Sequence, residues 1–393
     1  MNVFDVKKVK TAVVGCGMIS NSYIHNLNHL FTVVDLAAVC DVNPEAARQK
    51  AETYGVAKSM TLDEIAADPA IELVVCLTPA PIHYSVMKRM LEAGKHVYTE
   101  KMFTTDLEHA RELVALAKSK GLQIAVAPDT VLGAGIQTAR HIIDLGLVGK
   151  ITSGFVSITR SHLLNSELYR FLQAEGGALP YDVGIYYIGA LVALLGPVKS
   201  IRAFGAPALE HNRQFMYQEQ KQNTWTIPGN NVVAAALEFA SGALVTVHIN
   251  GNTVCTEQCR FELYGTRGIL KPGDPDVFGD PVKLLLPENE ECTFPFTHGY
   301  NGKNMLAPYP FEFYGHRGIG VAEECYAIRS GRNARLSGDY GLHCQEVLYG
   351  IDQAAASGGN YEMTSSCEVR PLAPGFYSSF NGGRGDAEGS LAE

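Results

Sequence analysis

The sequence predicts an α/β protein built on two β-sheets. Its first part should form a doubly wound parallel sheet covered by helices, and its second part an α/β domain with a large, open, mostly antiparallel sheet. Three observations indicate this arrangement. Strand-like and helix-like runs alternate up to Pro128, glycines stand between the first strand and the first helix, and longer runs of alternating apolar and polar residues follow.

Short apolar runs in the first part alternate with segments of helical composition. The expected strands cover 10–15, 33–40, 71–78, 95–100 and 122–128, and the expected helices cover 18–30, 43–55, 80–94 and 107–121. Pro44 in the first turn of the second helix and Gly55 at its end are start and stop signals. Strands joined by helices of this length run parallel, because each connection returns the chain to the same end of the sheet.

The pattern changes after Pro128. Residues 133–149 predict a helix that leads out of the first sheet, and later strand-like runs cover 151–163, 198–207, 230–251, 259–271 and 281–287. The pieces "ASGAL" and "GTRG" favour antiparallel hairpins. We therefore expect domains at 1–128 and 129–370 and a glycine-rich, acidic tail at 371–393. An open sheet often pairs with a copy of itself, which predicts a homo-oligomer, a dimer or a tetramer.

Length and composition limit the classes of function. The chain has 393 residues, a net charge of −9 and a pI near 5.8, which argues against nucleic acid or an anionic membrane as a partner. Its nine cysteines are scattered without a CxxC pair, so neither a disulfide framework nor a metal site is expected. The N-terminus lacks the features of a signal peptide, and no run approaches the roughly 20 apolar residues of a membrane span. We expect a soluble, cytoplasmic protein.

Glycines mark the turn between the first expected strand and the first expected helix. "VVGCGMIS" contains Gly15-x-Gly17-x-x-Ser20, and Met18 and Ile19 lie in the same turn. Glycines there permit a tight turn and let backbone N–H groups approach a pyrophosphate at the helix N-terminus. We expect this turn to bind a dinucleotide cofactor through the two glycines, Met18 and Ile19.

Asp41 ends the second expected strand, where a carboxylate can bind the ribose 2′-hydroxyl of an adenine nucleotide. An alternative is that Asp41 caps the helix that follows. Val42 offers no positive charge for a 2′-phosphate. The sequence therefore favours NAD over NADP.

Two pairs of polar residues are candidates for chemistry. Glu100 and Lys101 end the fourth strand, at the carboxyl edge of the sheet where open α/β folds bind ligands, although they could instead be an exposed ion pair. Asp182 and Tyr186 are four residues apart at the start of an apolar helix, so they share one helical face. The alternative makes Asp182 a helix cap and Tyr186 a core aromatic.

Five segments together resemble the Gfo/Idh/MocA family of sugar and cyclitol oxidoreductases in order and spacing. They are "VVGCGMIS", "CDVNPEAARQKAETYG", "LTPAPIHYSVMKRMLEAGKHVYTEK", "GGALPYDVGIYYIGALVALLG" and "GIGVAEECYAIRSGR". The resemblance runs from about residue 9 to about residue 358. It implies a Rossmann domain, a C-terminal α/β domain with an open sheet, and NAD(P)-linked oxidation of a ring hydroxyl.

The resemblance also assigns catalytic residues. Lys101 matches the lysine of the family's E-K-P motif, with Glu100 before it, and Met102 stands in place of the proline. Asp182 matches the aspartate of the D-x-G-x-H motif, and Tyr186 falls where the histidine usually lies. The resemblance therefore implies that Lys101 reaches both the cofactor and the substrate hydroxyl.

Further residues match family positions around the cofactor. Thr78, Pro79 and His83 match a T-P-x-x-x-H stretch that lines it. The arginine that the family often carries after the fifth strand is absent. Asp129 and Thr130 stand there as the polar groups expected at the substrate.

The residue types fit the oxidation of a secondary alcohol, which needs a hydride acceptor and a base. We expect Tyr186 to be the base, Lys101 to be its electrostatic aid and Asp182 to orient the sugar or the lysine. Tyrosine has an unperturbed pKa of about 10, and we expect the ammonium and the cationic nicotinamide to lower it. Lys101 could itself be the base if its own pKa is lowered.

Other readings stay open. An enzyme with the same oxidation residues could keep NAD bound and act as a redox-neutral glycosidase or lyase, and a Rossmann scaffold could be a non-catalytic nucleotide sensor. Arg160 and His162 follow the first strand of the second part and are further candidates for binding a carbohydrate or cyclitol substrate, with an exposed strand end as the alternative.

Overall fold

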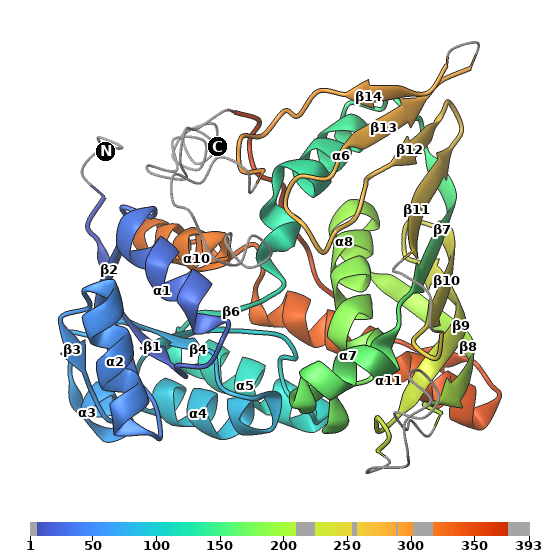
Figure 1. The fold of residues 1–393 in the computed structure, drawn as a ribbon. Helices are drawn as coiled ribbons and strands as arrows, with labels where there is room; N and C mark the ends of the chain where they lie inside the picture. The colour runs from blue at the N-terminus through green and yellow to red at the C-terminus, as the bar shows by residue number, and fades with distance from the viewer. Residues whose placement is uncertain (1–5, 210–224, 254–257, 288–289, 302–316, 376–393) are drawn as a thin grey trace.

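The computed structural model describes residues 6–209, 225–253, 258–287, 290–301 and 317–375. They form two sheets that lie side by side, each with helices against it (Figure 1). The last part of the expected tail, 376–393, lies outside the described residues.

The first sheet has six strands in the order β3-β2-β1-β4-β5-β6, and all of its pairings are parallel. This confirms the predicted doubly wound sheet. The strands are β1 (Val9–Val14), β2 (Val34–Cys40), β3 (Lys58–Ser59), β4 (Leu73–Cys76), β5 (His96–Thr99) and β6 (Ile124–Val126). All four residues of β4 are buried, as expected for a strand covered on both faces.

Helices join these strands, and their ends follow local capping rules. They are α1 (Ser20–His29), α2 (Pro44–Tyr54), α3 (Leu62–Ala67), α4 (Ala80–Glu92) and α5 (Leu107–Lys120). Pro44 occupies the first turn of α2, and Gly55 ends the helix in the left-handed conformation with φ of 67°. Both predicted signals are therefore confirmed.

A short 3-10 turn, η1 (Asp129–Leu132), and α6 (Ala134–Asp144) lead from the first sheet to the second. The second sheet has nine strands in the order β14-β13-β12-β11-β7-β10-β9-β8-β15. These are β7 (Ile151–Thr159), β8 (Val198–Pro207), β9 (Asn230–Phe239), β10 (Leu244–Asn250), β11 (Gln258–Gly265), β12 (Ile269–Lys271), β13 (Val282–Leu285), β14 (Cys292–Phe294) and β15 (Tyr361–Glu362). Only β7 and β10 pair in parallel, so the predicted mostly antiparallel sheet is confirmed.

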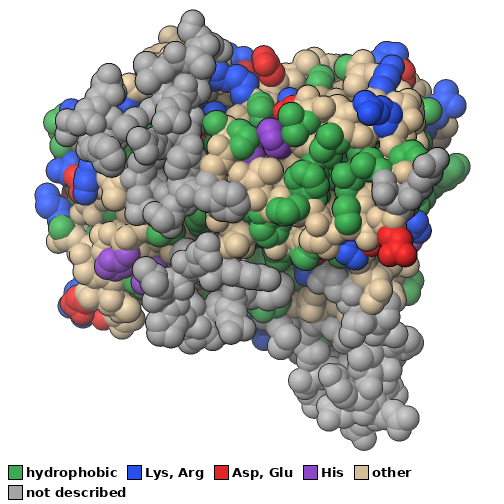
Figure 2. Space-filling view, turned by 90° about the horizontal axis from the view of Figure 1, so that it is seen from above, with side chains coloured by type: hydrophobic (Ala, Val, Ile, Leu, Met, Phe, Trp, Pro, Cys, Tyr) green, Lys and Arg blue, Asp and Glu red, His purple; other side chains and the backbone are tan. Residues whose placement is uncertain are grey.

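Helices cover one face of the second sheet. α6, α8 (Ile185–Leu195) and α11 (Gly338–Ser357) lie on the side that faces the first sheet (Figure 1). Every residue of α8 is buried, which its continuous apolar sequence predicts. Seen from above, hydrophobic side chains gather in a patch on the half of the molecule that holds this sheet (Figure 2).

One late helix returns to the first sheet. α10 (Ile319–Ser330) lies beside α1, although nearly 300 residues separate them in the chain (Figure 1). The side-chain amide of Asn26 in α1 donates to the carbonyl of Arg317, just before α10, at 2.7 Å. The C-terminal segment thus reaches the carboxyl edge of the parallel sheet.

The sequence did not predict the short strands β3, β14 and β15, nor the short helix α7 (His162–Leu168) with the 3-10 turn η2 (Arg170–Gln173) after it. Two or three residues carry too little periodicity to indicate a strand, and pairing with a neighbour decides it. No helix among the described residues combines the length and the apolar content needed to cross a membrane.

Candidate active site

The glycine turn after β1 has room for a ligand on one side only. Gly15 has φ of 105°, and a Cβ atom there would lie 2.7 Å from the backbone of Leu77, after β4. Gly17 is exposed, and a Cβ atom there would meet nothing within 4 Å. Gly15 therefore allows the two loops to cross closely, while Gly17 leaves its backbone accessible to a phosphate.

The start of α1 completes this turn. Ser20, at the position where dinucleotide-binding turns usually carry a third small residue, is buried and its hydroxyl donates to the carbonyl of Gly17 at 2.6 Å. Its polar group is thus satisfied inside the helix–strand contact. Met18 is 54% exposed and Ile19 is half-buried, so both flank the open side of the turn.

Asp41, just after β2, forms a hydrogen bond with the same turn. Its carboxylate accepts the N–H groups of Cys16, at 2.8 Å, and Asn43, at 2.9 Å. Asn43, not Asp41, caps α2, so the alternative role for Asp41 is wrong. Val42 is fully exposed beside it. The open glycine turn and the adjacent carboxylate fit the phosphates and ribose of a dinucleotide.

The loops after β4 and β5 are tied together by His83. Its ring nitrogens lie 2.6 Å from the carbonyl oxygens of Met102 and Thr78. Burial lowers the pKa of His83, although both carbonyls favour the protonated form. His83 is buried and supports the two loops, whereas Pro79 is exposed and Thr78 half-buried at the mouth. The Lys101–Met102 peptide bond in the second loop is cis.

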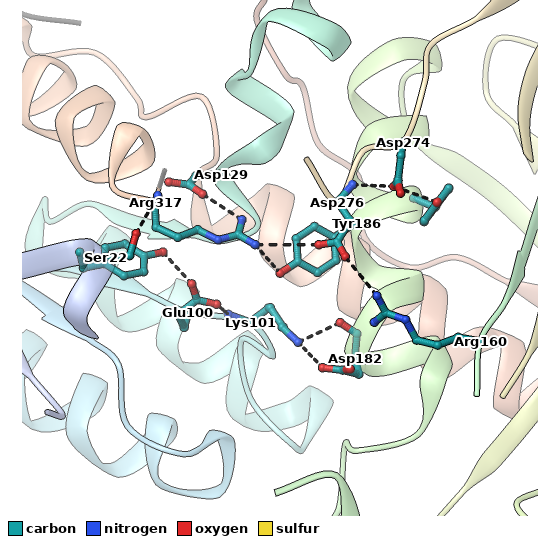
Figure 3. Close-up of polar contacts among 12 residues, drawn as sticks. Ser22, Glu100, Lys101, Asp129, Arg160, Asp182, Tyr186, Asp274, Asp276 and Arg317 are labelled. Carbon is teal, nitrogen blue, oxygen red and sulfur yellow. Dashed lines mark hydrogen bonds and ion pairs between the residues drawn. The ribbon is translucent and has the colours of Figure 1, made fainter. Parts of the chain in front are cut away.

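Lys101 follows the end of β5 and pairs with a residue from the second part of the chain. Its Nζ donates to the carbonyl of Asp182 at 2.8 Å and to its Oδ1 at 2.5 Å (Figure 3). Burial by itself would lower the pKa of Lys101, but Asp182 and Tyr186 outweigh it and raise the pKa. The same ammonium offsets the effect of burial on Asp182 and lowers the pKa of that carboxyl. Lys101 therefore stays charged, which disfavours it as the base.

Glu100 does not form the exposed ion pair that was one alternative. It is buried, and its carboxylate accepts the hydroxyl of Tyr23 at 2.7 Å and the backbone N–H of Lys101 at 3.0 Å. Tyr23 belongs to α1, so Glu100 links the end of β5 to the helix that begins at the glycine turn.

Asp182 lies in a π-helical turn, η3 (Pro180–Gly184), that runs directly into α8. Such single turns often occur at functional sites in proteins. Asp182 makes no capping bond, because its carboxylate is turned toward Lys101. The alternative role as a helix cap is therefore wrong.

Tyr186, in the first turn of α8, is buried, and its hydroxyl accepts a hydrogen bond from Arg317 Nη2 at 2.9 Å (Figure 3). The Nζ of Lys101 lies 5.7 Å from the centre of its ring. Burial raises the pKa of Tyr186, and Arg317 and Lys101 only partly oppose the rise. The structure thus differs from the expectation of a lowered pKa: desolvation outweighs the two cations of the protein.

Arg317 was not predicted as a site residue. Its guanidinium lies between Tyr186 and Asp129, and its Nη1 donates to Asp129 Oδ1 at 3.3 Å (Figure 3). Asp129 is completely buried, and its other oxygen accepts the N–H groups of Gly318, at 2.8 Å, and Gly320, at 3.3 Å. Asp129 therefore lies behind Arg317 and anchors it, away from the position expected for a substrate ligand.

Asp276 also was not predicted. It lies on the loop between β12 and β13, with oxygens 3.9 Å from Arg317 Nη2 and 3.8 Å from Arg160 Nη2. Burial raises the pKa of Asp276, and both arginines oppose the rise. The side chains of Arg160 and Asp276 remain partly exposed, at 17% and 15%. They are polar groups beside Arg317 that solvent can still reach.

Two other expected substrate residues are turned inward. Thr130 is buried, and its hydroxyl has no partner among the described residues. His162 is buried at the start of α7, with Nε2 2.7 Å from the carbonyl oxygen of Gly177. Burial lowers the pKa of His162. The charges of Asp182 and Lys101 act on the pKa of His162, so its ring lies near that pair, with its described hydrogen bond made to the backbone.

Comparisons with known proteins agree with this arrangement. Residues 9–127 match an oxidoreductase family with an NAD-binding Rossmann fold, and residues 136–271 match the GFO/IDH/MocA C-terminal domain. An uncharacterized oxidoreductase of Schizosaccharomyces pombe is 30% identical over 319 residues, which cover 78% of this chain and 79% of the relative.

Other relatives match over shorter stretches. An inositol 2-dehydrogenase/D-chiro-inositol 3-dehydrogenase of Lactiplantibacillus plantarum is 29% identical over 150 residues, 36% of this chain and 41% of the relative. The chain spans about half the length of several curated relatives that it matches. In a second uncharacterized oxidoreductase of S. pombe, for example, the match covers 56% of the relative.

Solved structures of other proteins share this fold. Levoglucosan dehydrogenase in complex with NADH superposes with a TM-score of 0.75 and 20% identity, over 91% of this chain and 100% of that chain. The two family matches cover the first sheet and strands β7 to β12 of the second, and the glycine turn with Asp41 fits the cofactor. The chain therefore belongs to the Gfo/Idh/MocA family of NAD-binding oxidoreductases.

Proposed function

We propose that the protein uses NAD to oxidise a secondary hydroxyl on the ring of a sugar, glycoside or cyclitol to a ketone. In this proposal residues 1–128 bind the cofactor, and residues 129–370 bind the substrate and form the oligomer contact. The observation that carries the proposal is the meeting of Lys101, from the carboxyl edge of the parallel sheet, with Asp182 and Tyr186, from the second part.

NAD, when bound beside the glycine turn, would supply the acceptor for the hydride. Tyr186, in its phenolate form, takes the proton of the substrate hydroxyl, and the carbon loses its hydride to give the ketone. Lys101 keeps its charge and stabilises the negative charge that develops on the substrate oxygen. Asp182 holds the ammonium in place through two hydrogen bonds. In the reverse direction Tyr186 returns the proton.

The charges at the site support a neutral, polyhydroxylated substrate. Lys101 is paired with Asp182, and Arg317 with Asp129. Arg160 lies close to Asp276. Because each cation already faces a carboxylate, an acidic sugar would gain little, whereas carboxylates and guanidinium groups can all bind hydroxyls. An inositol dehydrogenase and levoglucosan dehydrogenase among the similar proteins support the same class.

The test is NADH absorbance with NAD and a panel of free sugars, cyclitols, anhydrosugars and aryl glycosides at mildly alkaline pH. We expect NADH to accumulate with one group of neutral compounds. Release of the aglycone that requires NAD but yields no NADH would replace the proposal with a redox-neutral glycosidase. Binding of NAD with neither product would favour a nucleotide sensor.

A further inference from the structure

Arg317 approaches Tyr186 from a distant part of the chain and is firmly held. Its backbone N–H donates to Ser22 Oγ at 3.2 Å, and its carbonyl accepts from Asn26 Nδ2 at 2.7 Å. Both partners belong to α1. With Asp129 on the guanidinium as well, Arg317 has fixed contacts at its backbone and its charged end.

The guanidinium is placed to act on the tyrosine oxygen. Its central carbon lies 5.3 Å from the centre of the Tyr186 ring and 5.7 Å from that of Phe278. Nη2 donates to the hydroxyl, so the oxygen accepts from Arg317 and its own proton is directed elsewhere. A hydrogen bond from a cation stabilises a phenolate more than a phenol, because only the phenolate carries the opposite charge.

The other charged groups around Tyr186 do not supply this contact. Lys101 donates hydrogen bonds to Asp182, and its Nζ lies over the ring of Tyr186. The carboxylates of Asp276 and Glu100 act against a phenolate. Among the described residues, Arg317 is the cation that donates a hydrogen bond to the hydroxyl oxygen of Tyr186.

We infer that Arg317 is a positioning residue, which holds the Tyr186 hydroxyl with its proton toward the substrate and stabilises the phenolate during proton transfer. This inference rests on the proposed function, since it gives Arg317 a role through Tyr186. Arginine suits the role because it stays protonated at every working pH. Asp129 in turn aligns the guanidinium.

The direct test replaces Tyr186 with 3,5-difluorotyrosine, whose phenol is more acidic than that of tyrosine. The ¹⁹F NMR shift of this residue is then measured against pH, without cofactor or substrate, to give the midpoint at which its phenol loses the proton. With R317Q in the same protein we expect the midpoint to rise by about 1 pH unit or more, as for loss of an adjacent opposite charge. R317K, which keeps the charge with different geometry, should give a smaller rise. Equal midpoints in all three proteins would overturn the inference.

A second readout uses the compound that the panel shows to be oxidised most rapidly. R317Q should lower kcat by about 10²-fold, the usual effect of removing one donor to a developing negative charge, and move the rising limb of the pH profile to higher pH. If Y186F keeps wild-type turnover, the role of Tyr186 as the base is wrong and the inference about Arg317 falls with it, although the oxidation itself stands; if no compound of the panel is oxidised, the proposed function is wrong. If Y186F is inactive but R317Q keeps the wild-type profile, only the inference about Arg317 is wrong.

Discussion

The protein favours the protonated forms of both Tyr186 and Lys101, and the different charges of these two forms separate their roles. Asp182 and Tyr186 together raise the pKa of Lys101 against the effect of burial. Burial also raises the pKa of Tyr186, so its resting form is the phenol. The phenol is a ready proton donor for reduction, and oxidation requires extra stabilisation of the phenolate.

Replacing Tyr186 with Phe should remove the proton acceptor and leave the cofactor turn intact. We expect kcat to fall about 10²- to 10⁴-fold, the range for loss of a general base, while the Kd for NAD changes little. Steady-state kinetics and NAD titration measure the two effects. Y187F is the matched control, because Tyr187 bonds to Asp274 at 2.9 Å and lies outside the proposed chemistry. Equal losses of turnover in both variants would count against the assignment.

Replacing Asp182 with Asn should leave Lys101 partly buried without its carboxylate. Breaking such a pair costs on the order of 3 kcal/mol of unfolding free energy. Because the folded-state pKa of Asp182 is lowered, its contribution is fully present above its unfolded pKa of about 4 and is lost as the pH falls through the lower folded-state pKa. Urea unfolding should therefore show a large difference in stability between wild type and D182N at pH 7 and a smaller difference at pH 3.

The control for this prediction is D339N, which removes an exposed pair between Lys118 and Asp339. An exposed pair of this kind contributes less than about 1 kcal/mol. A loss in D182N as small as that in D339N would mean that the Lys101–Asp182 pair does not stabilise the fold.

Val42 bears on the choice between NAD and NADP. It is fully exposed next to Asp41, and a cation at this position would lie near a 2′-phosphate. V42R should therefore strengthen NADP binding by about tenfold, the effect of roughly 1.4 kcal/mol from one charge-assisted contact. Isothermal titration with both cofactors checks this. An unchanged ratio of the two affinities would mean that the ribose lies elsewhere.

At the scale of elements, the site is built where three segments end. The turn between β1 and α1 is the proposed cofactor contact, the end of β5 provides Lys101, and η3 with α8 provides Asp182 and Tyr186. Helix α1 connects them further, because Tyr23, Ser22 and Asn26 bond to Glu100 and Arg317. Helix α1 therefore begins at the glycine turn and also holds Glu100 and Arg317, the neighbours of Lys101 and Tyr186.

The glycine turn gives a prediction at this scale. G17A should fold normally, because its new Cβ meets nothing within 4 Å, but it should weaken NAD binding about tenfold or more by blocking backbone access. G55A is the control, with a loss of about 1 kcal/mol from its left-handed position and no effect on NAD. Thermal melts and NAD titration compare them. Wild-type NAD affinity in G17A would place the phosphates away from Gly17.

At the scale of the whole molecule, the helices of the described residues lie on one face of the second sheet (Figure 1). Phe204 on β8 is 82% exposed and Leu244 on β10 is 61% exposed. We propose that a second copy of the chain covers the outer face of this sheet, because large apolar side chains on a broad sheet favour self-association.

F204D should disrupt that contact without unfolding the monomer. Light scattering coupled to gel filtration should give a dimer or tetramer for the wild type and a smaller species for F204D. F171D is the control, since Phe171 is 61% exposed on η2, outside the sheet. A monomeric wild type would contradict the proposal.

The sequence by itself determined the parallel sheet, the capped helices and the glycine turn between β1 and α1. These depend on local periodicity, on Pro44 and Gly55, and on the glycines after β1, all readable within a few residues. It also brought Lys101, Asp182 and Tyr186 forward as candidates, through motifs that each span only a few positions.

Only the tertiary structure decided what surrounds that group. Asp129 and Arg317 are 188 residues apart in the chain, and Arg317 and Tyr186 are 131 apart. Arg317 has no local pattern that marks it, since its role depends on α10 returning to α1. The sequence also could not predict that the pKa of Tyr186 is raised, because desolvation depends on how completely the fold buries the ring. Local order follows from neighbours in sequence, whereas burial and pairing follow from neighbours in space.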